Sequence, residues 1–148
     1  DTISAGHKED KAGKAIIKKL EECDVKISEY VIIPDEKDII QDKAKSYQEQ
    51  GIDMVIYTGG TGLSGRDVTP EALIPILDRR IPGIEEAIRS YGQGRMPFAM
   101  LSRSVAGTLG DTLVLALPGS TNGAKESMDA IFPAVLHSFR ILKGARHD

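Results

Sequence analysis

The sequence predicts an α/β domain in which helices cover both faces of a parallel or mostly parallel sheet. Segments with helical periodicity alternate with short apolar runs, which is the pattern of strand–helix–strand units. The 148 residues, of which 41% are apolar, suffice for one domain with a single core, taken as residues 1–148. Loops rich in small residues follow the apolar runs, and in such folds ligands bind at the carboxyl ends of the strands.

The first half of the chain predicts two helices and two strands. Apolar residues recur with helical spacing over residues 12–20. The mostly β-branched run at residues 25–33 predicts a strand that ends at Pro34. A second helix is expected over residues 36–50, with acidic residues at its start and a glycine after it. The apolar run at residues 52–57 is typical of a buried parallel strand.

Beyond a glycine-rich loop, a helix is expected to begin with Thr69 as N-cap and Pro70 in its first turn. Residues 81–83 break that helix, and residues 84–91 predict another short one.

The last third predicts a hairpin and a long helix. We expect strands at residues 98–102 and 112–117, joined by a turn containing Gly107 and Gly110. An amphipathic pattern then predicts one helix over residues 122–142.

Composition excludes several classes of protein. A net charge of −3 and 5% aromatic residues argue against a nucleic-acid binder. No apolar run approaches the roughly 18 residues of a membrane span, and no signal-peptide pattern opens the chain. The single cysteine, Cys23, excludes an internal disulfide and a cysteine-rich zinc site, and favours a reducing, cytoplasmic setting.

The glycine-rich loop fits G-x-G-x-x-G literally from Gly60 to Gly65, but its context is wrong for a dinucleotide site. Four residues separate the motif from Pro70, so a helix N-terminus would not face a pyrophosphate. The acidic residue expected about 20 positions later would fall at Glu85 or Glu86, within a predicted helix. A P-loop is excluded because no Gly-Lys-Ser/Thr closes the motif.

Two interpretations of this loop stay open. Its glycines allow backbone N–H groups to approach an anion, with the hydroxyls of Thr58, Thr61 and Ser64 at the same edge. Arg66 would then supply positive charge, and Asp67 a metal ligand or base. Alternatively, the loop is a tight connection in which Arg66 and Asp67 form an exposed ion pair worth under about 1 kcal/mol.

Other loop residues are equally ambiguous. Asp35 precedes a predicted helix, where an aspartate ordinarily serves as N-cap. Ser120 either caps the last helix or, with Gly119, forms an anion site at its N-terminus. Residues 102–104 are either turn residues at the surface or a second polar wall.

The sequence as a whole resembles the MogA/MoaB molybdopterin-binding domain, which also occurs in the plant Cnx proteins and in gephyrin. The resemblance covers nearly the whole chain in order. It rests on residues 4–6, 33–36, 57–62 (YTGGTG), 66–72 (RDVTPEA), 81–83, 97–104, 106–107 and 117–120.

The resemblance implies a three-layer α/β fold, usually trimeric, with one site at the strand ends of each subunit. It implies a Mg²⁺-dependent adenylyltransferase that joins the AMP part of ATP to the terminal phosphate of molybdopterin and releases pyrophosphate. The two essential aspartates of the family fall on Asp35 and Asp67, as catalytic residues and as Mg²⁺ ligands. We therefore expect molybdopterin and ATP as partners, and a molybdate-insertion protein as a further one.

The resemblance also implies a binding surface. Ser4, Ala5 and Gly6 would line the nucleotide side. The pterin and phosphate parts would be held by Thr58, Gly59, Gly60, Thr61, Gly62, Arg66, Ser102, Arg103, Ser104, Pro118, Gly119 and Ser120. Arg66 or Arg103 would neutralise charge on the leaving pyrophosphate.

Two departures accompany the resemblance. The family's hydrophobic first strand has no counterpart before Asp1, so we expect the natural polypeptide to continue upstream. Ser120 and the residues after it replace the Asn/Gln-Pro that often follows Pro-Gly. A non-catalytic molybdopterin-binding or scaffold domain, and a part of a larger molybdate-insertion protein, remain alternatives to the enzyme.

Overall fold

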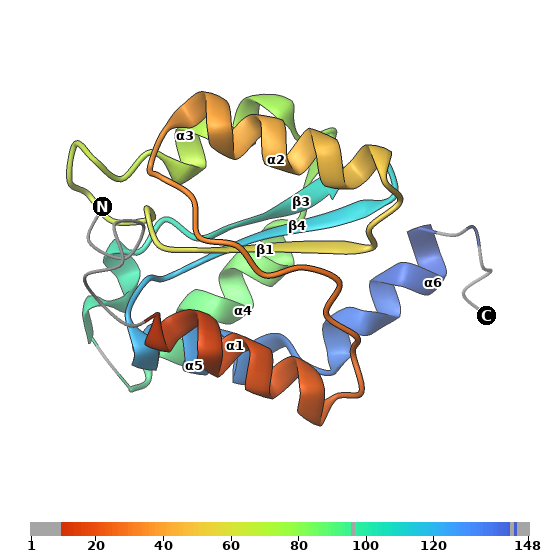
Figure 1. Cartoon of the computed structure of the whole chain (residues 1–148). Coiled ribbons are helices and arrows are strands. Elements are labelled where there is room, and N and C mark those ends of the chain that lie inside the picture. The colour runs from red at the N-terminus through yellow and green to blue at the C-terminus, as the bar shows by residue number, and fades with distance from the viewer. Residues whose placement is uncertain (1–9, 96, 143, 145–148) are drawn as a thin grey trace.

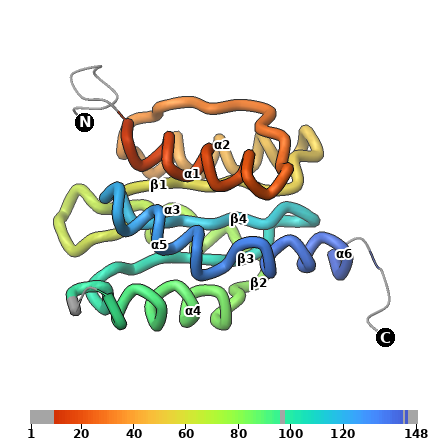
Figure 2. The backbone as a smooth tube through the Cα atoms, turned by 90° about the horizontal axis from the view of Figure 1, so that it is seen from below, coloured from red at the N-terminus to blue at the C-terminus, as the bar shows by residue number. Residues whose placement is uncertain are grey.

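Two layers of helices enclose a four-stranded sheet in the computed structural model, which describes residues 10–95, 97–142 and 144 (Figure 1). The strand order is β1-β4-β3-β2, seen across the sheet in Figure 2. β1 pairs in parallel with β4, whereas β3 is antiparallel to both β4 and β2. The strands are β1 (Met54–Thr58), β2 (Arg79–Arg80), β3 (Val105–Leu109) and β4 (Thr112–Leu117). The expected three-layer α/β architecture is confirmed.

The helices divide between the two faces of this sheet (Figure 1). One face is covered by α1 (Lys11–Glu22), α4 (Pro82–Gln93) and α5 (Thr121–Ile131), and the other by α2 (Lys37–Glu49) and α3 (Thr69–Leu73). No helix of the described part of the chain has the length and apolarity that crossing a membrane would require.

β4 explains why a continuous apolar run marks the centre of the sheet. Leu113, Leu115 and Leu117 pack toward α1, α4 and α5, whereas Val114 and Ala116 pack toward α2 and α3. All five are fully buried, because side chains alternate between two covered faces. β4 therefore anchors both halves of the core.

The strand expected at residues 25–33 is wrong. Residues 25–33 are not part of any strand of the described sheet, although Val25 and Ile27 pack against the core. Among those residues β1 pairs with β4 alone, so the segment lacks the neighbour that a ladder needs. A groove of about 610 Å³ is lined by this segment, α1 and β1.

The strand expected at residues 98–102 is also wrong. Pro97–Leu101 is a 3-10 turn, in which Phe98 and Met100 are 72% and 63% exposed. The actual strand, β3, begins at Val105. Gly110, with φ of +59°, lies in the turn before β4, but Gly107 lies within β3, where a Cβ would collide with the carbonyl oxygen of Arg79. Apolar composition alone did not separate an exposed turn from a strand.

The single helix expected over residues 122–142 is interrupted. α5 ends at Ile131, a 3-10 turn covers Ala134–His137, and α6 spans Ser138–Leu142. Pro133 accounts for the break, because the residue before a proline disfavours the helical conformation. Phe132 is accordingly extended, with ψ of 141°.

Candidate functional site

Two loops meet where β1 and β4 end. The hydroxyl of Thr58 donates to the carbonyl of Pro118 at 2.9 Å, and Gly59 N donates to the carbonyl of Leu117 at 2.9 Å. A Cβ on Gly119 would lie 3.0 Å from Gly59 Cα. The glycine loop and the Pro-Gly-Ser turn thus form one continuous backbone surface.

The glycines allow the loop to turn back against α3. Gly59 and Gly60 have φ of +98° and +69°, a region that residues with a side chain rarely adopt. Thr69 holds the turn, since its hydroxyl donates to the carbonyl of Gly59 at 3.0 Å and its N–H to that of Gly60 at 3.1 Å. Thr69 is the first residue of α3, and Val68 is the N-cap, so the expected capping role of Thr69 is wrong.

Arg103 forms hydrogen bonds with the second part of the glycine loop, from Thr61 to Asp67. Its backbone N–H donates to Thr61 O at 2.8 Å, its Nε to Gly62 O at 2.9 Å and its Nη2 to Asp67 O at 2.8 Å. Its Nη1 pairs with the carboxylate of Glu71 on α3. This hydrogen bond lowers the pKa of Glu71 below its ordinary value.

A row of hydroxyls lies beside this contact. Thr61 Oγ1 lies 3.4 Å from Ser102 Oγ, which lies 3.2 Å from Ser104 Oγ. Thr61 and Ser104 are 3% and 2% exposed, so the row is not a set of surface turn residues. The interpretation as surface turn residues is therefore wrong for Ser104, whereas the role of residues 102–104 as a polar wall stays a prediction.

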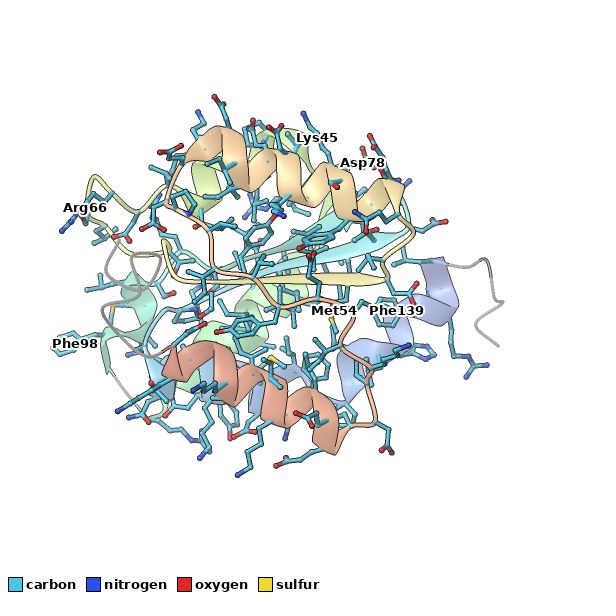
Figure 3. The ribbon with its side chains drawn as sticks, in the orientation of Figure 1. Lys45, Met54, Arg66, Asp78, Phe98 and Phe139 are labelled. Atoms are coloured by element: carbon cyan, nitrogen blue, oxygen red, sulfur yellow. The ribbon has the colours of Figure 1, made fainter. Side chains whose placement is uncertain are left out.

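Asp67 closes a short turn in the loop. Its Oδ2 accepts a hydrogen bond from Ser64 N at 2.9 Å, and its own N–H donates to Ser64 O at 2.9 Å. A Cβ on Gly62 would lie 2.8 Å from Asp67 Oδ2, so the carboxylate lies directly over that glycine. In the described part of the chain Arg66 forms no ion pair with Asp67, and its side chain extends outward (Figure 3). The ion-pair interpretation is therefore wrong.

Asp35 lies at the end of the groove nearest the glycine loop. It is exposed and lines the groove together with Thr58, Gly59 and Thr69. The N-cap of α2 is Glu36, without a side-chain hydrogen bond, so the capping interpretation of Asp35 is wrong. Asp35 and the start of the glycine loop thus line the same groove.

Ser120 caps α5, because its Oγ accepts a hydrogen bond from Gly123 N at 3.0 Å. The three residues expected on the nucleotide side, Ser4, Ala5 and Gly6, lie outside the described residues.

Two contributors were missed by the sequence analysis. The sequence pattern predicts only a capping role for Thr69 and no role for Glu71. The one available signal was their place directly after Asp67, within the segment of residues 66–72 that carries the family resemblance.

The carboxylates near the glycine loop could form part of a Mg²⁺ coordination shell, but not a complete set of protein ligands. The described residues contain no cluster of three or more side chains able to hold a metal. Mg²⁺ commonly takes one or two carboxylates and completes its shell with phosphates and water. Exposed Asp35 and half-buried Asp67 fit that partial set.

Comparison with known proteins decides the family. The family model described as a probable molybdopterin binding domain matches residues 1–137. The chain belongs to this molybdopterin-binding family. A molybdenum cofactor biosynthesis protein B of Staphylococcus aureus is 39% identical over 86% of the chain and 79% of its own length. The crystal structure of the molybdopterin biosynthesis enzyme MoaB of Thermus thermophilus superposes with a TM-score of 0.91 at 38% identity, covering 100% of this chain and 94% of that one.

One relative of this chain, the molybdenum cofactor biosynthesis bifunctional protein of Chlorobaculum tepidum, is a longer protein. It is 37% identical over 99% of this chain. The chain spans only 47% of the length of that protein.

Proposed function

We propose that the domain acts in molybdenum cofactor biosynthesis as a molybdopterin adenylyltransferase. The observation that carries the proposal is the contact between Gly59 and Gly119, which joins the glycine loop, on which Asp67 also lies, to the turn around Gly119 in one backbone surface. The family membership supplies the ligand class, and the names of the relatives supply the pathway.

The proposed reaction joins two phosphate-bearing molecules. An oxygen of the terminal phosphate of molybdopterin attacks the α-phosphorus of ATP, a new P–O bond forms, and the bond from that phosphorus to the bridging oxygen breaks with release of pyrophosphate. The attacking phosphate is already ionised near neutral pH, so the site needs charge neutralisation and alignment rather than a strong base.

In the proposed mechanism, backbone groups contribute much of the phosphate binding and alignment. N–H groups of the glycine loop and of the turn around Gly119 bind phosphate oxygens without bulk. The half-buried hydroxyl of Ser102 would offer a further polar contact, held in place by the buried hydroxyls of Thr61 and Ser104. Arg66, whose side chain is exposed and forms no ion pair among the described residues, would neutralise charge on the leaving pyrophosphate.

Asp35 and Asp67 would hold the Mg²⁺ that accompanies ATP. The ion supplies charge neutralisation on the triphosphate. Asp67 presents one oxygen to Ser64 N and keeps the other oriented by the same turn. Asp35 would approach from the groove that Gly59 also lines.

A homotrimer in the cytoplasm, working with a molybdate-insertion protein, completes the proposal. Equilibrium sedimentation should give three times the 16.0 kDa of the chain. A monomer at micromolar concentration would refute the trimer.

The activity is tested by incubating the protein with molybdopterin, ATP and Mg²⁺ and measuring pyrophosphate. We expect release that requires all three components. Saturable quenching of pterin fluorescence without pyrophosphate would refute the enzyme and favour a binding or scaffold domain.

A further inference from the structure

The side chain of Arg103 spans the part of the glycine loop that carries Asp67. Nε holds the carbonyl of Gly62, and Nη2 holds that of Asp67, at 2.9 and 2.8 Å. These two carbonyls mark the two ends of residues 62–67. The planar guanidinium therefore fixes the distance between the ends of the segment.

No other hydrogen bond among the described residues joins residues 62–67 to another element. Their remaining bonds are internal, from Asp67 N to Ser64 O, from Ser64 N to Asp67 Oδ2 and from Arg66 N to Ser64 Oγ. Leu63 at the tip is 68% exposed, so packing adds little restraint there. Arg103 is the main tie between this segment and the rest of the fold.

The charge of Arg103 is also already matched. Its Nη1 donates to the carboxylate of Glu71, and all three guanidinium nitrogens have protein acceptors. A phosphate would have to compete with that carboxylate. Arg66, which has no ion pair in the described part of the chain, carries no such competitor.

We infer that Arg103 is a positioning residue that fixes the backbone from which the Asp67 carboxylate projects, and that it does not itself bind the phosphates of ATP. The inference deepens the proposed adenylyl transfer and rests on it for the role of Asp67. The two arginines of the site then have different roles. Arg103 orders the loop, and Arg66 neutralises the charge of the pyrophosphate.

Amide hydrogen exchange tests the loop without needing any activity. In the substrate-free protein, Arg103→Met should raise exchange of the residue 62–67 amides about 10-fold or more, because their tie to the fold is lost. Arg66→Met is the matched control, since it removes an arginine of the same loop whose side chain makes no hydrogen bond in the described structure. Its loop amides should exchange as in the wild type.

Steady-state kinetics then separate positioning from binding. Arg103→Met should lower kcat about 100-fold with little change in KM for ATP, as expected for misplacement of a reacting group. Arg66→Met should instead raise KM for ATP. Wild-type exchange combined with a raised KM for ATP in Arg103→Met would overturn the inference.

Arg103→Lys covers the case in which the methionine variant does not fold. Lysine keeps the charge, but its single ammonium cannot hold the Gly62 and Asp67 carbonyls in the fork geometry. We expect faster loop exchange and a lowered kcat here too, and wild-type values of both would overturn the inference. If the wild type itself releases no pyrophosphate, the adenylyl transfer fails, while the exchange measurements still decide whether Arg103 orders the loop.

Discussion

The hydroxyl of Thr69 fills the space that a side chain on Gly60 would need. A Cβ on Gly60 would collide with Thr69 Oγ1 and would lie 3.2 Å from Thr69 Cβ. The same hydroxyl donates to the carbonyl of Gly59. The position of the Thr69 hydroxyl therefore requires a glycine at position 60 and also stabilises the turn at Gly59 and Gly60.

Gly60→Ala should destabilise the domain by about 2–4 kcal/mol. Strain from a side chain at φ of +69° adds to the collision with Thr69. Urea-induced unfolding followed by circular dichroism measures the change. Gly60→Ala should cost less when added to Thr69→Ala than when added to the wild type, because the collision with the hydroxyl is already absent while the strain remains.

Gly65→Ala is the matched control in the same loop. A Cβ at Gly65 has nothing within 4 Å, and its φ is not in the positive region. Its effect should stay within about 0.5 kcal/mol. Equal unfolding midpoints for the Gly60 and Gly65 variants would contradict the assigned contact.

Glu85 ties α4 to the edge of the sheet. Its carboxylate, 4% exposed, accepts from Ala106 N at 3.0 Å and binds Arg80 through two guanidinium nitrogens. Glu85→Ala should cost about 2–3 kcal/mol, because a buried N–H loses its acceptor while the exposed Arg80 regains water. Urea unfolding measures the loss.

Glu86→Ala, at the exposed neighbouring position, provides the comparison. Its change should be within about 0.5 kcal/mol. A Glu85 variant as stable as the Glu86 variant would remove the structural role from this carboxylate.

Local chemistry made part of the site predictable. The glycines after a strand predict a turn with accessible backbone, and Ser120 before a helix predicts its N-cap. Both features depend only on residues that are close in sequence. Pro133 is an equally local signal for the end of α5, whereas the amphipathic pattern continues past it and by itself predicts a helix that does not end there.

The remainder depends on contacts between distant segments. Arg103 and Gly62 are 41 positions apart, and Thr58 and Pro118 are 60 apart, so no rule on spacing links them. The wrong prediction of a strand at residues 25–33 also has its cause in contacts between distant segments. Its composition suits a strand, but strand formation requires a neighbouring edge that the sequence pattern does not report.

The ion pair of Glu71 with Arg103 should appear in the pH dependence of stability. The pair lowers the pKa of Glu71 from its ordinary value of 4.5 in the folded state. Its contribution is therefore present above pH 4.5 and is lost as the pH falls through the lower folded value. The stability advantage of the wild type over Glu71→Gln should shrink with acidification, as urea midpoints from about pH 7 to 3 would measure. A constant difference over that range would contradict the assignment.

Asp67→Asn should lower pyrophosphate release about 100-fold or more while leaving the fold intact. The amide oxygen still accepts from Ser64 N, so the turn persists, but the negative charge proposed to bind Mg²⁺ is lost. Release measured against Mg²⁺ concentration should show a weakened response, and thermal unfolding should be close to that of the wild type.

Asp78→Asn is the control for this substitution. Asp78, like Asp67, accepts a hydrogen bond from a backbone N–H, that of Gly110 at 2.7 Å. It is exposed and lies far from Arg66 across the molecule (Figure 3). Its loss of charge should leave pyrophosphate release unchanged, because the site lies at the opposite end of the sheet. Wild-type release from the Asp67 variant would remove that carboxylate from the reaction. An equal loss in both variants would show that net charge, rather than a bound cation, governs the rate.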